Sequence, residues 1–469
     1  MTAILSYGAY VPFYRLARAT ISAALGVDAG KGARAVASYD EDTVTMAVEA
    51  ARACMAAAGA AVPDVVSFAT TDPPYLEKLN AATVHAALDL PSEARAVDLA
   101  CSLRCGLAGL LQAADAAASG RTSLVTMSDI RIGAPEGPAE RGGGDGAAAF
   151  LVGPGKGIAR IVETYSETHE YLAQWRAPGQ RFARAWEERF ALTQAYQPLM
   201  QRAAATLLER AGVGVERIKA AVLDAPNPRA AGPVAKAIGL RPEQMVDSLL
   251  TEIGHTGTAH AGLMLASALD RAEPGDLLLV VSVSDGVDGL LLEVTEGRKT
   301  FEPRRTVAAL VASKRDDLPY TRYLKWRGLL ETEPPRRPDP DRPAAPPSLR
   351  SERWKFAFVG SQCSACGTYH LPPQIVCVAC RASGRMKPAP FADRRASIRT
   401  FTIDRLAYTP QPPMVVAVID FEGGGRFESE LTDCEPEKVE IGQQVEMTFR
   451  RLYTAQGVHN YFWKARPIR

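Results

Sequence analysis

The stretch "VEAARACMAAAGAAVPDVVSFATT", residues 48–71, has the pattern of an amphipathic helix, an Ala-Gly stop and a buried strand. The stretch "MQRAAATLLERAGVGVERIKAAVLDAP", residues 200–226, repeats the same order of features. An Asp-Gly turn that leads into an apolar strand also occurs twice, in "DGAAAFLVG" (145–153) and "DGVDGLLLEV" (285–294). Helices that alternate with β-rich runs are typical of an α/β domain. Two α/β halves of about 150 residues each are the simplest explanation, and chance similarity between two Ala-rich segments is the alternative.

Composition separates this repeated part from the rest of the chain. A chain of 469 residues is too long for one ordinary core, so two or three domains are expected. The segment "ETEPPRRPDPDRPAAPPSLR" is rich in proline and predicts an extended, fairly stiff linker. After it, a cysteine-rich stretch and short strands replace the helices. We therefore predict an N-terminal α/β half at 1–155, a second half at 156–330, the linker at 331–350, a helix with a cysteine-rich module at 351–385 and a β-rich domain at 386–469.

Charge and hydropathy narrow the class of protein. Lys and Arg number 54 against 53 Asp and Glu, and a net charge of +1 gives no reason to expect nucleic acid as a partner. No apolar run approaches the 18 or so residues of a membrane helix, and the N-terminal stretch lacks the pattern of a signal peptide. These observations predict a cytoplasmic protein that does not enter a membrane.

Four cysteines near the C-terminus have the spacing of metal ligands. They occur as Cys363-x2-Cys366-x10-Cys377-x2-Cys380. In a reducing compartment, two CxxC pairs at this spacing favour tetrahedral zinc, with iron in a rubredoxin-like site or a redox dithiol as alternatives. Because all four ligands are thiolates, no coordination position stays open for a substrate. The zinc site is therefore predicted to be structural.

Several motifs of the repeated part resemble a known superfamily. The stretches "ASYDEDTVTMAVEAA" (37–51), "FATTDPPYLEKLNAATVHAALDL" (68–90) and "RGGGDGAAAFLVG" (141–153) resemble 3-hydroxy-3-methylglutaryl-CoA synthases of the thiolase superfamily. Residues 223–286 resemble the second half of ketoacyl-ACP synthase III. The resemblance implies the duplicated α/β/α/β/α fold of these enzymes, in five layers, and a coenzyme A thioester as substrate.

The C-terminal part resembles the small proteins that accompany thiolases. Those proteins combine an N-terminal helix, a rubredoxin-like zinc ribbon and a small OB-fold β-barrel, and they bind beside a thiolase subunit. The resemblance implies a zinc ribbon within residues 351–385 and an OB-fold within residues 386–469. OB-folds also bind nucleic acid, but a basic stripe with interleaved aromatic residues is not evident here.

The resemblance raises the question of the nucleophile. In the superfamily a cysteine at the N-terminus of a buried helix takes the acyl group, because a thiolate attacks thioesters well and helix N–H groups lower its pKa. Counting from Asp98 and from the helix "GLAGLL" places this position on Leu103. Cys101 and Cys105 lie two residues to either side, so each is a nucleophile only if the turn is rebuilt, and otherwise a buried packing residue. The backbone N–H of Leu103 remains a candidate oxyanion donor.

Other active-site positions are altered as well. The family histidine falls on Asp224 in "DAPN", a candidate base if burial raises its pKa, or else a turn residue. Asn227 keeps the family asparagine and is assigned to binding the CoA thioester. The second asparagine falls on His255 in "GHTGTAH", which is followed by His260, and imidazole there can act as acid, base or oxyanion donor. Gly286 is assigned as a backbone oxyanion donor.

Asp72, in "TTDPP", lies near the position of a catalytic glutamate of the synthases and is either a catalytic carboxylate or a turn residue. The preferred prediction is an acyl-CoA-dependent enzyme that forms or cleaves a C–C bond, including aldol or retro-aldol chemistry on a β-hydroxyacyl-CoA without an acyl-cysteine. A non-catalytic acyl-CoA-binding subunit that completes a partner thiolase, and a synthase with a relocated cysteine, are the alternatives. The resemblance further implies a homodimer.

Overall fold

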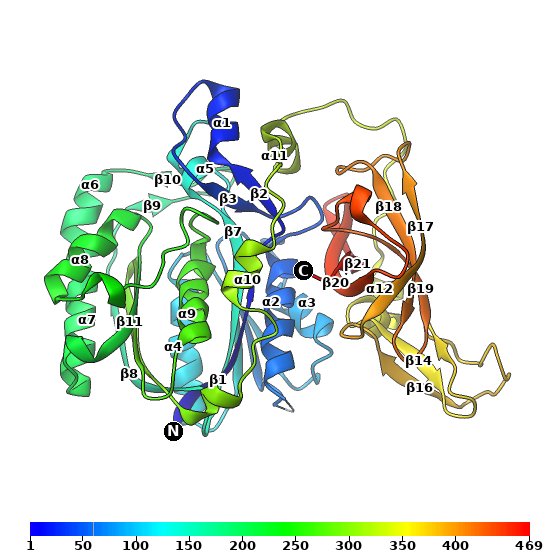
Figure 1. The fold of residues 1–469 in the computed structure, drawn as a ribbon, viewed down its shortest axis with the longest axis horizontal. Helices are drawn as coiled ribbons and strands as arrows, with labels where there is room; N and C mark the ends of the chain where they lie inside the picture. Colours follow the sequence, from blue (N-terminus) through cyan, green and yellow to red (C-terminus); the bar gives the residue numbers. More distant parts are fainter. Residues whose placement is uncertain (60) are drawn as a thin grey trace. The chain divides into compact units, whose positions relative to one another are not determined.

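The computed structural model describes residues 1–59 and 61–469 of the chain (Figure 1). These residues form two compact units. The first consists of Met1–Ala37, Met46–Ala82 and Pro91–Tyr323, and the second of Ser38–Thr45, Thr83–Leu90 and Leu324–Arg469. Among the described residues, no helix combines the length and apolar character that crossing a membrane requires.

The first unit is built on a nine-stranded mixed sheet with the order β11-β12-β13-β8-β1-β7-β6-β4-β5. Strands β5, β4 and β6 are parallel, and β7 and β1 continue antiparallel. Strands β11 and β12 are likewise parallel, and β13 and β8 continue antiparallel. The counterpart of β5 is reduced to a parallel bridge between Ala221 and Met245. The predicted duplication is therefore confirmed. The strands are β1 (Thr2–Tyr10), β4 (Val65–Thr70), β5 (Arg95–Ala100), β6 (Ser123–Ile130), β7 (Asp145–Pro154), β8 (Ala159–Thr168), β11 (Ile218–Asp224), β12 (Leu277–Ser284) and β13 (Gly286–Val294).

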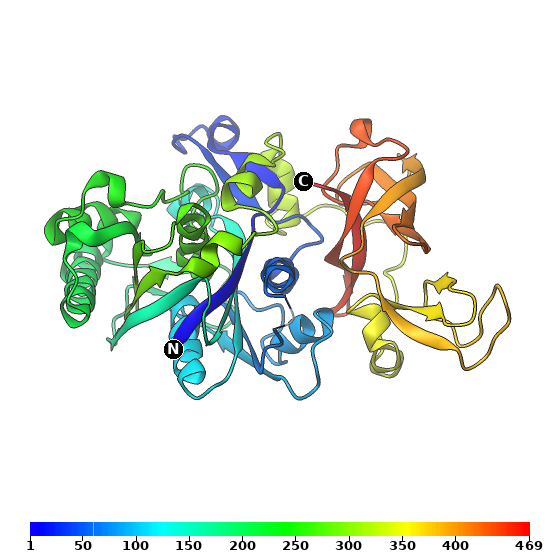
Figure 2. The same ribbon diagram turned by 60° about the horizontal axis from the view of Figure 1, so that its bottom comes forward.

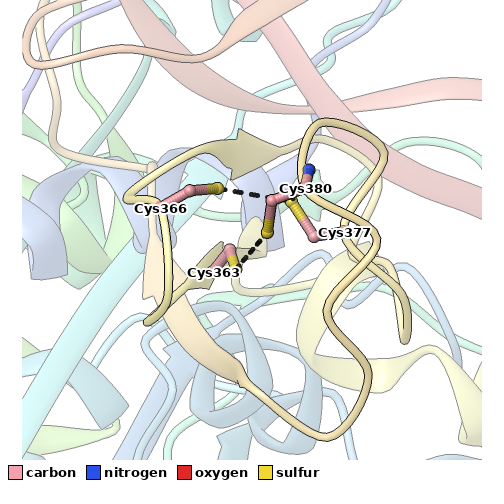
Figure 3. A group of neighbouring side chains, drawn as sticks. All are labelled: Cys363, Cys366, Cys377 and Cys380. Atoms are coloured by element: carbon pink, nitrogen blue, oxygen red, sulfur yellow. Dashed lines mark hydrogen bonds between the residues drawn. The ribbon is translucent and has the colours of Figure 1, made fainter.

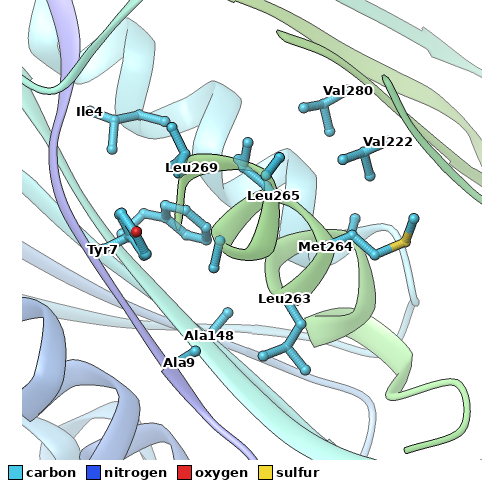
Figure 4. Packing of buried hydrophobic residues seen from close by; sticks show 14 of the residues in the cluster. Ile4, Tyr7, Ala9, Ala148, Val222, Leu263, Met264, Leu265, Leu269 and Val280 are labelled. Atoms are coloured by element: carbon cyan, nitrogen blue, oxygen red, sulfur yellow. The ribbon is translucent and has the colours of Figure 1, made fainter. Parts of the chain in front are cut away.

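Two helices form the central layer between the two halves of this sheet. They are α4 (Cys105–Ala118) and α9 (His260–Arg271), and each contacts strands of both halves. Every residue of α9 from His260 to Leu269 is buried, as expected for a helix that is covered on all sides. Figure 4 shows α9 with Tyr7 and Ala148 on one side and Val222 and Val280 on the other.

Outer helices complete the five layers. On one side lies α2 (Thr43–Ala57), of which Met46 onward belongs to this unit, and it approaches β1 so closely that a Cβ at Gly8 would lie 2.2 Å from the carbonyl oxygen of Ala50. On the other side α7 (Gln197–Ala211) covers β8, β12 and β13. Smaller elements of this unit are β2 (Tyr14–Ala17) with β3 (Ala33–Val36), β9 (Gln174–Trp175) with β10 (Arg184–Ala185), and the helices α1 (Arg18–Leu25), α5 (Pro138–Gly142), α6 (Glu188–Phe190), α8 (Ala231–Ile238) and α10 (Val307–Ala312). The residues of α3 (Ala81–Ala87) from Thr83 and those of α11 (Tyr320–Trp326) from Leu324 belong to the second unit.

The second unit contains a three-stranded sheet and a five-stranded sheet, drawn in yellow and in orange to red in Figure 2. The larger sheet has the order β19-β18-β17-β20-β21, and a bridge between Leu431 and Ala465 brings its two ends together into a barrel. Burial alternates along β18, as expected for a strand with one face on the core. The strands are β14 (Val359–Cys363), β15 (Tyr369–His370), β16 (Met386–Pro390), β17 (Ala396–Asp404), β18 (Met414–Phe421), β19 (Arg426–Glu430), β20 (Gln444–Ala455) and β21 (Val458–Pro467).

Two details of the second unit differ from the prediction. The proline-rich segment is not extended throughout, because α12 (Ala345–Arg350) begins inside it, followed by α13 (Glu352–Lys355). Pro346 and Pro347 lie in the first turn of α12, where a missing N–H removes no helical hydrogen bond. Strand β16 pairs with β14, so the smaller sheet extends past the predicted boundary at residue 385.

An acidic stretch from the N-terminal part of the chain is built into the second unit. Lys464 on β21 lies 3.0 Å from a carboxylate oxygen of Asp40, and Arg450 on β20 pairs with Glu41 and, at 2.5 Å, with Asp433. All five side chains are almost fully buried. The composition of residues 38–45 alone did not indicate this placement.

Candidate active site

Two turns face each other at the beginnings of the central helices. The α4 turn, residues 101–104, connects β5 to α4, and the α9 turn, residues 254–259, leads into α9. A Cβ at Gly106, in the first turn of α4, would lie 2.2 Å from the carbonyl oxygen of Thr258. Only glycine permits this approach, so the sequence brings the two turns together by omitting a side chain.

Cys101 opens the α4 turn and is exposed. Its φ of +81° lies in the left-handed region, which is unfavourable for a residue with a side chain and is often found at functional sites. Leu103 lies within the α4 turn, because α4 itself begins at Cys105.

Cys105 has a different environment. Its side chain packs against the main core, and burial, together with the nearby carboxylate of Asp129, raises the pKa of the Cys105 thiol far above its usual value. The thiol therefore stays protonated at neutral pH and is a poor nucleophile.

Asp224 and His255 form a buried pair at the end of β11. Nε2 of His255 lies 3.1 Å from Oδ1 of Asp224, and the hydroxyl of Ser282 donates to Oδ2 at 2.9 Å. Burial pushes the pKa of Asp224 upward, but His255, His260 and Ser282 outweigh it, so its pKa is lowered. The condition under which Asp224 was a candidate base, a pKa raised by burial, is not met, because hydrogen-bond donors surround the buried carboxylate.

His260 lies beside this pair and stacks on His255, which is the histidine that hydrogen-bonds to Asp224. Its ring stacks on that of His255 with 4.3 Å between centroids, and its Nδ1 accepts from the backbone N–H of Thr256 at 3.3 Å. Burial and the neighbouring His255 lower the pKa of His260 to about 3. His260 is therefore neutral at physiological pH.

The cluster Asp224, His255 and His260 has ligand atoms within 4.8 Å of one another, a spacing at which they could hold a metal ion. Nδ1 of His255 accepts from the N–H of Gly257 at 3.2 Å, and Nδ1 of His260 accepts in the same way from Thr256. Each ring therefore carries its proton on Nε2, which is the reverse of a metal-bound imidazole that donates through its other nitrogen. The hydrogen bonds fit a cluster for proton transfer and do not fit a metal centre.

Asp129, which was not among the predicted site residues, organises the site through its hydrogen bonds. This carboxylate, fully buried at the end of β6, accepts from the hydroxyl of Thr70 at 2.9 Å, the N–H of Thr71 at 2.7 Å and the N–H of Thr258 at 2.8 Å. It thus holds the α9 turn and the loop that follows β4. The signal was available, because a Ser-Asp pair ends the strand in both repeats.

Asp72 follows Thr71 in this loop and is partly buried. Arg176, on the β9–β10 hairpin, donates to the carbonyl of Thr71 at 2.6 Å and lies 3.4 Å from the Asp72 carboxylate. Burial raises the pKa of Asp72 to about 6, although Arg176 lowers it. A carboxyl group with a pKa in this range can exchange protons near neutral pH.

Two further candidates have local structural roles. The side chain of Asn227 accepts from the N–H of Arg229 at 3.1 Å and caps the short helix Pro228–Ala230, so the structure does not direct it toward the facing turns. Gly286 begins β13 with a φ of +124°, and a Cβ there would lie 2.2 Å from the carbonyl oxygen of Glu167. Glycine is required at this position for steric reasons.

The four C-terminal cysteines converge in the second unit (Figure 3). The sulfur atoms of Cys363 and Cys380 are 3.7 Å apart, and those of Cys366 and Cys377 are 3.5 Å apart. Four sulfurs at about 2.3 Å from a tetrahedral zinc would be separated by about 3.8 Å, so the donor set and its spacing fit zinc. The predicted structural zinc site is confirmed.

Residues 208–293 match the family described as the C-terminal domain of 3-oxoacyl-[acyl-carrier-protein] synthase III. Residues 356–385 match the rubredoxin-like zinc ribbon domain of ChsH2, and residues 390–450 match the C-terminal OB-fold domain of ChsH2. These matches and the duplicated fold place the first unit in the thiolase superfamily.

Curated relatives define the family more narrowly. The chain is 34% identical to hydroxymethylglutaryl-CoA synthase of Methanopyrus kandleri over 337 residues, which cover 69% of this chain and 95% of the relative. It is 32% identical to the same enzyme of Methanocaldococcus jannaschii, covering 71% of this chain and all of the relative (100%). The chain therefore belongs to the hydroxymethylglutaryl-CoA synthase family.

Solved structures show the same fold. A hydroxymethylglutaryl-CoA synthase complexed with CoA matches with a TM-score of 0.61 and 22% identity, covering 69% of this chain and 89% of that chain. The 3-oxoacyl-(acyl carrier protein) synthase III of Pseudomonas aeruginosa matches with a TM-score of 0.56 and 22% identity, covering 63% of this chain and 98% of that chain.

Proposed function

We propose that the chain condenses acyl-CoA thioesters, with Cys101 as the acceptor of the acyl group. The observation that carries this proposal is the exposed Cys101, which has a left-handed conformation and lies in the turn before α4, a helix whose first turn approaches the α9 turn that contains His255. The curated relatives are named as synthases that act on CoA thioesters, and one structural relative was solved with CoA. Acyl-CoA is therefore the proposed substrate class.

The residues divide the chemistry as follows. The Cys101 sulfur attacks the thioester carbonyl, and the proton of its thiol passes to the departing sulfur, so coenzyme A leaves as its thiol. Asp72 removes a proton from the carbon next to the new thioester, and the resulting enolate attacks the carbonyl carbon of a second acyl-CoA, whose oxygen takes up a proton. The raised pKa of Asp72, about 6, suits its proton transfer. Water then hydrolyses the thioester to Cys101 and releases the product. Asp224, held ionised, accepts a hydrogen bond from Nε2 of His255, and together with the Gly257 N–H on Nδ1 it fixes the orientation of this ring in the α9 turn.

A second function is supported by the Asp224–His255 pair itself. This pair supplies a base independently of any cysteine, as retro-aldol cleavage of a β-hydroxyacyl-CoA requires. In that reaction the base takes the hydroxyl proton, and the C–C bond breaks to give a carbonyl compound and the enolate of the acyl-CoA. The enolate is then protonated. The backbone N–H groups of Leu103 and Gly286 remain proposed oxyanion donors for either version.

The two versions are separated by intact-mass measurement after incubation with acetyl-CoA. We expect an acetyl adduct on the wild-type chain that is lost in Cys101→Ser and kept in Cys105→Ser, the matched control at the first residue of α4. If no adduct forms and turnover of a β-hydroxyacyl-CoA survives Cys101→Ser, the condensing proposal is refuted and the aldol version is supported. If neither reaction occurs, the chain is a non-catalytic acyl-CoA-binding subunit of a partner thiolase.

The proposal includes a homodimer in a reducing, cytoplasmic compartment. Strand β5 is the last strand of the nine-stranded sheet and is only partly buried, so its edge can pair with β5 of a second copy. Light scattering of the purified protein tests this, and a monomer at micromolar concentration would contradict it.

A further inference from the structure

The two halves of the first unit are joined by hydrogen bonds to carboxylates at equivalent positions of the repeat. Asp129, at the end of β6 in the first half, accepts from the N–H of Thr258 in the α9 turn at 2.8 Å. Asp285, directly after β12 in the second half, accepts from the hydroxyl of Ser102 in the α4 turn. Both carboxylates follow a serine at the end of equivalent strands. Each half therefore holds the turn in front of the central helix of the other half.

A second contact holds the α4 turn from its other end. Arg104, the last residue of this turn, donates to both carboxylate oxygens of Asp288 at 2.8 Å, in a two-pronged pair. The same guanidinium donates to the hydroxyl of Thr168 at 2.7 Å and to the carbonyl oxygen of Asp285 at 3.2 Å. Asp288 is only 1% exposed, so solvent weakens this pair little.

These two contacts lie on the C-terminal side of Cys101, the residue with the left-handed backbone. Such a conformation costs roughly 1–3 kcal/mol and persists only where the surrounding structure imposes it. Ser102 and Arg104 are the residues of the α4 turn that bond to the second half. The N-terminal side of Cys101 is held by β5, which pairs with β4 up to Ala100.

We propose that the Ser102–Asp285 and Arg104–Asp288 contacts are a positioning clamp, through which the second half of the duplicated domain sets the backbone of Cys101 and the direction of its sulfur. Ser102, Arg104, Asp285 and Asp288 are positioning residues that act through Cys101. The inference rests on the proposed role of Cys101 as acyl acceptor for its catalytic meaning, but the effect on the thiol is independent of that role.

The test compares Ser102→Ala and Arg104→Met with the full wild-type chain. The rate of iodoacetamide alkylation of Cys101, followed by peptide mass mapping across a pH series, reports the thiol directly. Single-turnover acylation by acetyl-CoA, followed by intact mass, reports the reaction. A side chain misplaced by about 1 Å slows a reaction by about 100-fold, so we expect acylation to slow by about 10- to 100-fold and the alkylation pH profile to shift.

Two matched variants separate positioning from general stability. Ser102→Thr keeps the hydroxyl and is expected to retain the wild-type alkylation profile. Arg160→Met removes an Arg–Glu293 pair that also joins β8 to β13, away from the α4 turn, and is expected to leave both rates unchanged. If Arg104→Met does not fold, Ser102→Ala still tests the clamp, because it removes a single hydroxyl group.

The outcomes distinguish the clamp from the proposed function. Wild-type alkylation and acylation in both Ser102→Ala and Arg104→Met would overturn the clamp and leave the acyl-cysteine proposal intact. Altered alkylation in these variants, with no acyl adduct on the wild-type chain, would support the clamp and overturn the role of Cys101 as acyl acceptor.

Discussion

Replacing Arg450 with Met tests whether the acidic stretch from the N-terminal part is an integral component of the second unit. Arg450 pairs with Glu41 and, at 2.5 Å, with Asp433, and the three side chains are all 0% exposed. The variant removes the guanidinium that the two carboxylates share. Loss of one partner of a buried ion pair costs about 3–5 kcal/mol, because the remaining charge stays buried.

A matched control isolates the effect of burial. Arg426, on β19 of the same barrel, pairs with Asp420, but its side chain is 60% exposed. Arg426→Met is expected to cost at most about 1 kcal/mol, because solvent screens an exposed pair. The expected difference between the two variants is therefore about 2–5 kcal/mol, the difference between these two ranges.

Urea unfolding of the full, zinc-loaded chain measures this difference. Trp463 on β21 is buried and donates to the carbonyl oxygen of Phe356, so its fluorescence reports unfolding of the barrel. With a slope of about 1–3 kcal/mol/M, the midpoint of Arg450→Met should fall by about 1–5 M. Adding Glu41→Leu to Arg450→Met should recover part of the loss, because it removes one buried charge. Equal midpoints for Arg450→Met and Arg426→Met would refute the reasoning.

Four further predictions concern the site and the second unit. Arg176→Gln should raise the pKa of Asp72 above about 6 and move the acid limb of the pH–rate profile to higher pH. Arg176→Lys keeps the charge and should leave the acid limb nearly in place. Identical profiles for wild type and Arg176→Gln would contradict the role of Arg176 in setting this pKa. Asp224→Asn should lower kcat by about 100- to 10,000-fold while the acyl adduct still forms, and normal turnover would remove Asp224 from the proton chemistry. Atomic emission should find about one zinc per chain, and Cys366→Ser should lose it together with stability of the ribbon; full stability after chelation would argue against a structural zinc. The pKa of Asp40 is lowered, because Lys464 and Arg450 hold the carboxylate ionised although burial opposes this. The unfolded chain therefore binds more protons in acid, so the stability that Asp40 contributes is complete above its unfolded pKa and should be lost as pH falls through its folded pKa. Asp40→Asn should flatten this pH dependence of stability, measured by urea titrations at different pH values.

Features that are local in the chain were predictable. The ligands Cys363, Cys366, Cys377 and Cys380 lie within one short stretch, so their spacing alone indicated the zinc site. The repeated order of helix and strand indicated the duplication, because the period of the apolar residues reports which face is buried. The Ser-Asp pairs at the ends of equivalent strands were visible, but their purpose was not.

The length of the α4 turn was not predictable from a motif count. Leu103 was selected by counting from Asp98 and back from the stretch "GLAGLL", and α4 begins two residues later, at Cys105. The pKa of Asp224 was also not predictable, since burial was considered without the donors His255 and Ser282 that the fold brings to it. In both cases the missing information was the position of distant segments.

The sequence by itself determined the duplicated α/β architecture, the zinc ribbon and the candidate residues, because helical period, strand alternation and ligand spacing are written in neighbouring residues. Only the tertiary structure decided which candidates work together. Ser102 and Asp285 are separated by 183 positions, and Glu41 and Arg450 by 409. Hydrogen bonds and ion pairs act over a few ångströms, so contacts of this kind exist only after the fold has brought distant strands and turns together.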